Sequence, residues 1–251
     1  LTISRLFLKP NCFNAGKQLI EFVISKYGAN GARTFIATIN DSYGELLQLF
    51  ADGCGFRQCS SEQLWKMSSL RFTQADNSFF RPFKNSDAQA VAMLFNDSII
   101  THFKYSIFRT KDEYLEPIFK GLKNDYKLKY VIEDENLKTL KAYFSLTTVD
   151  NLNYILDVTT SPWYDCSWDD ILNFTINQIL KRKQEFNLFV KVKKYTTTAE
   201  SLENYLTEKG FKCMQNQLVL VKDFYKVIKE PQQSNRVVLF NEINEKPVFK
   251  I

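Results

Sequence analysis

The order of apolar and polar positions predicts alternating strands and helices through the first third of the chain. Residues 3–10 alternate as a strand does, and Pro10, which has no N–H to donate to a sheet, ends the run. Residues 14–32 space their apolar side chains along one face of a helix, and Gly28 and Gly31 provide stop signals. The pattern then predicts a strand at 33–40, a helix at 42–50 and a strand at 63–67.

The same order of elements returns in the second half of the chain. Two stretches reveal the repeat, "GFRQCSSEQLWKM" at 55–67 and "GFKCMQNQLVLVK" at 210–222. Pro10 and Pro162 lie 152 positions apart, and Phe56 and Phe211 lie 155 apart, so the repeat has the size of a domain. In this second pass the pattern predicts strands at 153–162, 186–195 and 216–222 and helices at 167–183 and 198–211.

Further elements precede the second pass and have no counterpart before the first. They are a strand at 79–83, a helix at 85–97 capped by Asn85 or Ser86 with Asp87 in its first turn, a helix with turns at 102–122, and two strands within 129–148 joined by a polar turn at 133–136. The sequence therefore divides into a half domain at 1–67 (the first copy), a linker at 68–78, a complete domain at 79–223 (the second copy) and a tail at 224–251.

Composition narrows the class of protein. The 251 residues carry mixed charges and a net charge of +5, a basic surplus that permits an anionic ligand but disfavours nucleic acid as the partner. Five cysteines without a CxxC pair and a single histidine, His102, argue against a zinc site, and we expect no metal. Scattered thiols are typical of the reducing cytoplasm. No apolar run reaches the ~20 residues of a membrane span, and the oligomeric state stays open.

The ordered set of elements resembles the GNAT acyltransferase superfamily. The resemblance is carried by "LFLKPNCFNAGKQLIEF" at 6–22, "FFRPFKNSDAQAVAML" at 79–94, "ILDVTTSPWYDCSWDDIL" at 155–172 and the two "GF" closures. It implies an α/β fold with a mixed (α+β) sheet and two GNAT-like domains in tandem, the first only a C-terminal half. It also implies an acyl-CoA-dependent N-acyltransferase, in the first instance an acetyltransferase using acetyl-CoA. The acceptor would be an amine of a small molecule or a protein.

The resemblance implies a coenzyme A site at the start of the helix that follows the fourth strand of each domain. There a glycine-rich loop offers backbone N–H groups to the pyrophosphate. In the first copy the loop is about two residues short of the family pattern and retains one glycine. The alternative is that Gly16 is a turn residue and Lys17 a solvated charge. The candidate cofactor-binding residues are Leu8, Phe13, Asn14, Ala15, Gly16, Lys17 and Asn40.

The second copy has carboxylates at the equivalent place. Asp165, Asp169 and Asp170 surround the predicted helix start, where Ser167 is the expected N-cap. Carboxylates suit the helix dipole but repel a pyrophosphate. We therefore expect coenzyme A, if it binds, to bind the first copy.

Candidate catalytic residues are tyrosines, because the resemblance implies a tyrosine that protonates the leaving thiolate. Tyr205 occupies the matching position in the second copy, where the alternative is a packing residue. The first copy has Phe50 there, which leaves Tyr43 as its candidate. Asp157 lies on the second copy's fourth strand, where we expect a capping or surface role rather than that of a base. We expect the lysines of "KRKQEFNLFVKVKK" at 181–194 to form a solvated face.

Three hypotheses of function remain. The first is a tandem acyltransferase in which one copy, or a cleft between copies, binds acyl-CoA. The second is a catalytically decayed tandem module that serves binding or assembly. The third is a transferase that uses aminoacylated carriers. We also expect the natural polypeptide to extend before Leu1, because the first copy lacks its opening strands. We expect one of the two β-prone runs of the tail, at 236–240 and 247–251, to add to the sheet as a strand or to pack across the copies.

Overall fold

A computed structural model describes residues 12–68, 79–116, 126–134 and 139–224 of the chain. The predicted strand at 3–10 and the tail beyond Phe224 lie outside the described residues. The helical elements are α1 (Phe13–Ala29), α2 (Gly44–Gln48), a π-helical turn η1 (Leu49–Gly53), η2 (Asn85–Asp87), α3 (Ala88–Ser98), η3 (Thr101–Phe103), α4 (Lys104–Ile107), η4 (Lys111–Glu113), α5 (Trp168–Leu180) and α6 (Ala199–Glu208). The strands are β1 (Thr34–Asn40), β2 (Arg57–Lys66), β3 (Phe80–Pro82), β4 (Tyr126–Glu133), β5 (Leu140–Thr148), β6 (Asn153–Thr160), β7 (Asn187–Lys193) and β8 (Lys212–Asp223).

The strands form one eight-stranded sheet in the order β1-β8-β2-β7-β6-β5-β4-β3. All neighbours are antiparallel except β6 and β7, which run parallel. The β6–β7 pairing runs from Asn153 opposite Asn187 only as far as Asp157 opposite Lys191. Beyond this point β6 continues to Thr160 and β7 to Lys193, but the two strands no longer pair with each other, so they separate at their carboxyl ends.

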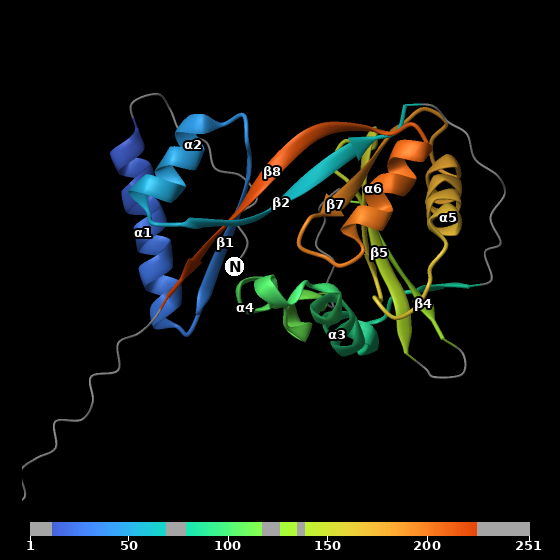
Figure 1. Cartoon of the computed structure of the whole chain (residues 1–251), viewed down its shortest axis with the longest axis horizontal. Coiled ribbons are helices and arrows are strands. Elements are labelled where there is room, and N and C mark those ends of the chain that lie inside the picture. Colours follow the sequence, from blue (N-terminus) through green and yellow to red (C-terminus); the bar gives the residue numbers. More distant parts are fainter. Residues whose placement is uncertain (1–11, 69–78, 117–125, 135–138, 225–251) are drawn as a thin grey trace, which may run out of the picture.

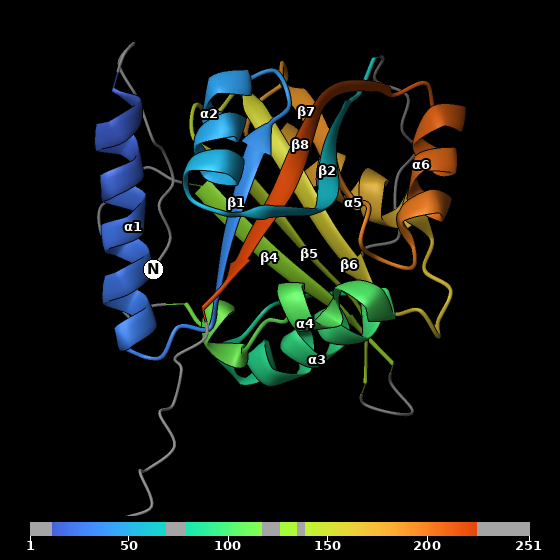
Figure 2. The same cartoon turned by 60° about the vertical axis from the view of Figure 1, so that its left-hand side comes forward.

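The two copies exchange their final strands. β8 belongs to the second copy but lies between β1 and β2, with Leu218 opposite Ile39. β2 belongs to the first copy but pairs with β7 of the second, with Trp65 opposite Val190. Both strands cross the middle of the molecule side by side, as Figures 1 and 2 show. The first copy therefore completes its sheet with a strand from the second.

Helices cover the two faces of the sheet unequally. One face carries α1, α2 and η1 over the first copy and α5 and α6 over the second (Figure 1). The opposite face carries α3 and the short helical turns around α4, packed against residues that include Val131, Tyr143 and Val219. On β1, Ile39 is buried against the first set of helices, whereas Ile36 on the opposite face is half exposed.

Several predicted elements differ in detail from the structure. The expected helix at 102–122 consists of η3, α4 and η4, three short turns, in its described part. The helix predicted at 85–97 begins with the turn η2, before which the N–H of Lys84 donates a 2.8 Å hydrogen bond to the carboxylate of Asp87. Asp87, rather than Asn85 or Ser86, is then the N-cap of α3, without a side-chain hydrogen bond to that helix. The Ser167 cap of α5 is confirmed, since its side chain accepts a hydrogen bond from the N–H of Asp170. None of the helices in the described part of the chain combines the length and apolar character that a membrane span requires.

Candidate functional site

The first copy's candidate cofactor residues gather at the start of α1. This helix begins at Phe13, and its first turn carries no acidic side chain. The helix provides no acceptor for the N–H groups of Phe13, Asn14 and Ala15, so these are the donors available to an anion, whereas the Gly16 N–H donates to the carbonyl of Cys12 at 2.9 Å. Asn14 and Ala15 are exposed, Gly16 is buried, and Lys17 lies 3.8 Å from Glu21 in an exposed pair. Leu8 lies outside the described residues.

The N-terminal end of α1 and the carboxyl end of β1 lie at the same end of the first copy (Figure 1). Phe13 packs closely against η1: a Cβ atom added at Gly53 would lie only 3.1 Å from the Phe13 ring. Asn40 is the last residue of β1, and its Oδ1 accepts hydrogen bonds from both the N–H and the hydroxyl of Ser42 at 2.9 Å. The structure thus places the helix start and Asn40 on one side of the first copy.

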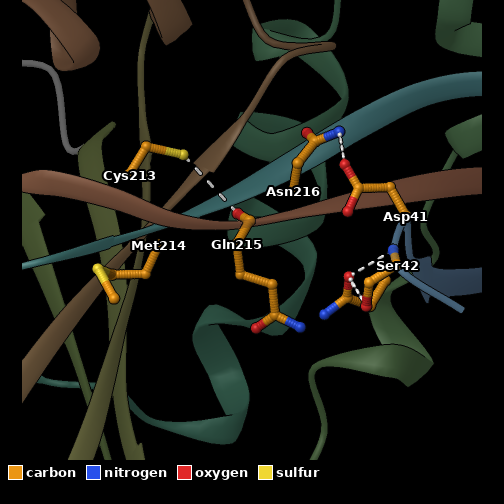
Figure 3. A pocket seen from close by; sticks show the side chains of 7 residues that line it. Asp41, Ser42, Cys213, Met214, Gln215 and Asn216 are labelled. Atoms are coloured by element: carbon orange, nitrogen blue, oxygen red, sulfur yellow. Dashed lines mark hydrogen bonds between the residues drawn. The ribbon is translucent and has the colours of Figure 1, made fainter.

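A hollow of about 360 Å³ opens beside Asn40 (Figure 3). The loop after β1 forms one wall, and the first part of β8 forms the other. Asp41 joins the two walls: its N–H donates to the carbonyl of Asn216 at 3.1 Å, and its carboxylate accepts from the Asn216 side chain at 3.1 Å. The hollow is lined by Asn40, Asp41, Ser42, Cys213, Met214, Gln215 and Asn216.

In the second copy, the crevice between α5 and α6 is almost closed. Only about 10 Å³ remains among side chains that include Leu156, Trp168 and Tyr205. Asp169 holds the two helices together, because its Oδ1 lies 2.6 Å from Lys209 Nζ and accepts a 3.0 Å hydrogen bond from Tyr205 Oη. The indole N–H of Trp168 also donates to Ser201 on α6 at 3.3 Å. At α5 the helix start is therefore flanked by carboxylates, and the crevice toward α6 is closed.

The two candidate catalytic tyrosines have different surroundings. Burial and the neighbouring Asp169 raise the pKa of Tyr205 above its ordinary value, so its hydroxyl is a weaker proton donor than a solvated tyrosine. Tyr43 is 60% exposed and precedes α2 on the same loop as Asn40, whose carbonyl accepts the Tyr43 N–H at 3.0 Å. Phe50, which replaces the tyrosine in the first copy, packs against Phe56 in the core. The tyrosines thus lie in separate copies.

Asp157 caps no helix, and its side chain, 29% exposed, is paired within the sheet rather than free on the surface as we expected. It lies at the point where β6 and β7 separate, and its Oδ1 accepts a 2.7 Å bond from Lys193 Nζ, which also contacts the hydroxyl of Thr159 at 3.0 Å. The Lys193 side chain is only 4% exposed, so the expectation of a solvated lysine face is also wrong here. Burial opposes the ionised form of Asp157, but Lys193 and Lys191 outweigh it and lower its pKa to about 2.

A second buried pair joins the copies on the same face of the sheet. Glu62 of β2 is 7% exposed at its side chain and lies 3.1 Å from Lys191 Nζ of β7. Its other oxygen accepts a 2.6 Å hydrogen bond from the hydroxyl of Tyr195. Burial raises the pKa of Tyr195 well above its ordinary value. Nearby, the guanidinium of Arg109 lies 4.2 Å from the centre of the Phe95 ring. Sequence reasoning missed this cluster, which consists of Glu62, Arg109, Asp157, Lys191, Lys193 and Tyr195.

The described residues contain no group of three or more His, Cys, Asp or Glu side chains placed to hold a metal ion. The described site consists of an open hollow between the loop after β1 and the start of β8, a closed crevice between α5 and α6, and a partly buried charged cluster around β6 and β7.

Comparison with solved structures identifies the fold. A tandem GNAT protein from the clavulanic acid biosynthesis pathway superposes on 89% of this chain and 74% of its own, with a TM-score of 0.54 and 10% identity. A GCN5-related N-acetyltransferase from Kribbella flavida covers 86% and 78% with a TM-score of 0.52 and 11% identity. Another, from Sphaerobacter thermophilus, covers 86% and 70% with a TM-score of 0.50 and 12% identity. No family sequence model matches the chain, and no curated sequence matches it significantly.

The protein has the mixed α/β fold of the GNAT acyltransferases. The fold expected from the sequence is thereby confirmed, and the similarity to a tandem protein extends over most of the chain.

Proposed function

We propose that the protein is an acyl-CoA-dependent N-acyltransferase with a single coenzyme A site, in the first copy. The contrast between the two copies carries this proposal. The start of α1 offers backbone donors without carboxylates and lies on the same side as an open hollow of about 360 Å³. In the second copy Asp169 and Asp170 occupy the first turn of α5, and the crevice beside this helix retains about 10 Å³. An anionic pyrophosphate is favoured at the first helix and opposed at the second.

In this proposal the first turn of α1, from Asn14 to Lys17, holds the pyrophosphate through the backbone N–H groups of Asn14 and Ala15 and the Lys17 ammonium, and the backbone at Asn40 lies beside the arm of the cofactor. The acceptor amine attacks the thioester carbonyl, an N–C bond forms and the C–S bond breaks. The nitrogen gives up a proton, and the leaving thiolate takes one. Tyr43 lies on the Asn40 loop with its side chain largely exposed, and it is the proposed proton donor of this site. The second copy completes the first copy's sheet through β8 and contributes one wall of the hollow.

A binding or assembly module without catalysis is the second candidate, and one observation favours it. The contacts of Asp169 with Tyr205 and Lys209 tie α5 to α6 and make the second copy a packed scaffold. In this alternative the exchanged strands provide a rigid platform and neither copy turns over acyl-CoA.

Calorimetric titration with acetyl-CoA, with coenzyme A as the control, tests the proposal. We expect one site per chain, together with a rise in melting temperature, because a ligand that binds only the folded state stabilises it. Release of free thiol in the presence of an amine mixture then tests turnover. Saturable binding without thiol release would favour the module. The absence of binding and of any thermal shift up to millimolar acetyl-CoA would refute the cofactor site.

A further inference from the structure

The geometry of the hollow at 40–42 and 213–216 assigns it a ligand: we propose that it binds an acceptor in which an ammonium group adjoins a carbonyl, as in an amino acid amide or a peptide N-terminus. This inference rests on the proposed function, because it names the acceptor of that site. It is carried by three side chains that come from both walls, Asn40, Asp41 and Gln215.

Asn40 presents an N–H donor to the hollow. Its Oδ1 accepts both hydrogen bonds from Ser42, which fixes the orientation of the carboxamide. The Nδ2 group must therefore face away from these two donors. Within the described part of the chain no acceptor contacts this nitrogen, and Asn40 lines the hollow. One amide donor is thus fixed in direction and available.

Gln215 brings a second carboxamide from the other copy. Its side chain leaves β8 and extends toward the Ser42 side of the hollow (Figure 3). Its carboxamide has no hydrogen-bond partner among the described residues, and its backbone pairs with Leu64 of β2. Two amide groups from opposite walls can therefore donate to one ligand oxygen, such as a carbonyl or a carboxylate oxygen.

Asp41 provides the opposite chemistry beside them. One of its oxygens accepts a hydrogen bond from Asn216. No lysine or arginine in the described part of the chain forms an ion pair with it, and none lines the hollow. An unneutralised carboxylate next to a concave surface attracts a cation, and an ammonium is the cation that an N-acyltransferase must bind. The hollow therefore combines an ammonium acceptor with two amide donors.

This combination discriminates between ligands. A phosphate or a simple carboxylate would be repelled by Asp41. A simple alkylamine would satisfy Asp41 but would leave both carboxamides without an acceptor. A molecule with an ammonium beside a carbonyl satisfies all three groups, and about 360 Å³ is at the lower end of the volumes of small-molecule sites. The hollow is open, so the chain of a peptide can continue into solvent.

Titration of the isotope-labelled full chain with alaninamide, followed by amide chemical shifts, tests this inference. Propylamine lacks the carbonyl and propionamide lacks the ammonium, so they are the matched half-ligands. We expect alaninamide to bind at least tenfold more tightly than either, with shifts concentrated at 40–42 and 213–216. The dipeptide Ala-Ala-amide separates the two sources of the ligand: equal or tighter binding indicates a peptide N-terminus, and loss of binding indicates a free amino acid derivative.

Two substitutions sharpen the test. Asp41→Asn should weaken alaninamide binding about tenfold, and Gln215→Leu should weaken it severalfold without changing the affinity for propylamine. Glu45→Gln removes an exposed carboxylate on α2 that does not line the hollow and should change nothing. Equal affinity for all three probes, shifts outside the hollow, or insensitivity to Asp41→Asn would overturn the assignment. The titration needs no acyl-CoA, so its result is independent of whether the cofactor binds.

Discussion

The hydroxyl of Tyr195 donates a 2.6 Å hydrogen bond to Glu62, and this contact joins the first copy to the second beneath α3. Removing the hydroxyl would leave one oxygen of a buried carboxylate without a donor, while Lys191 retains the other. An unsatisfied buried group of this kind lowers stability by about 1–3 kcal/mol. We therefore expect Tyr195→Phe to lower the free energy of unfolding by that amount, as measured by urea titration.

The matched control for this substitution is Tyr105→Phe, because Tyr105 is 93% exposed and loses only a solvated hydroxyl. Its urea midpoint should equal that of the natural protein. If both variants unfold at the same midpoint, the Tyr195–Glu62 contact contributes nothing measurable to the junction between the copies.

The Asp157–Lys193 pair should make stability depend on pH in the acid range. The pKa of Asp157 in the folded protein is about 2, below the ordinary value near 3.9. The ionised carboxylate thus stabilises the fold fully above its unfolded pKa, and this contribution is lost as the pH falls through about 2. At neutral pH we expect Asp157→Asn to lower the free energy of unfolding by about 2 kcal/mol.

Urea midpoints measured from pH 7 down to pH 2 provide the check. The difference between Asp157→Asn and the natural protein should shrink steadily below about pH 4. Asp165→Asn, an exposed carboxylate outside the cluster, should show no such trend. A difference that stays constant across the range would mean that the substitution acts through packing rather than through ionisation.

The shared strand β8 should make the two copies unfold together. Leu220 is 3% exposed in the core of the first copy, although β8 is the final strand of the second. Leu220→Ala should lower stability by about 2–5 kcal/mol, the usual range for such a truncation in a core. Hydrogen exchange should then show a loss of protection in both α1 and α5.

Leu19→Ala is the comparison for this variant, since Leu19 is 51% exposed on α1 and its truncation should leave exchange unchanged. If Leu220→Ala accelerates exchange in α1 alone, the first copy opens independently of the second.

The order of elements could be predicted from the sequence because periodicity and stop signals are local. The helix expected at 14–32 is α1, and the strand expected at 33–40 is β1. The exchange of strands could not be predicted, because alternation in β2 and β8 indicates a half-buried strand without indicating its partner. The aspartates at 169 and 170 indicated the contrast between the two helix starts, since the first turn of α1 has no acidic residue.

The buried cluster escaped prediction for a related reason. Lys191 and Lys193 alternate with apolar residues, a pattern typical of a strand with one solvated face. This face of the strand is largely covered instead, because α3 packs over part of it and Glu62 pairs with Lys191. Glu62 lies 129 positions before Lys191 in the sequence. The only sequence signal for the cluster is that the acidic residues Asp157 and Glu62 could balance the charges of these lysines. A sequence does not give the register between strands so far apart, so this pairing could not be predicted.

The last prediction concerns which copy binds the cofactor. Asn14 is exposed in the first turn of α1, where a carboxylate suits the helix dipole, so Asn14→Asp should keep or slightly raise stability. The same charge would oppose a pyrophosphate by on the order of 0.3–1 kcal/mol, so the affinity for acetyl-CoA should fall about two- to fivefold. Gly16→Asp adds a side chain at a buried position and should reduce affinity about tenfold or more.

The double variant Asp169→Asn with Asp170→Asn should leave the affinity nearly unchanged, because Asp169 already pairs with Lys209 and the cleft beside it is closed. Calorimetric titration of the three variants with acetyl-CoA decides between the copies: binding that responds to the double variant and ignores Asn14→Asp would place the cofactor in the second copy.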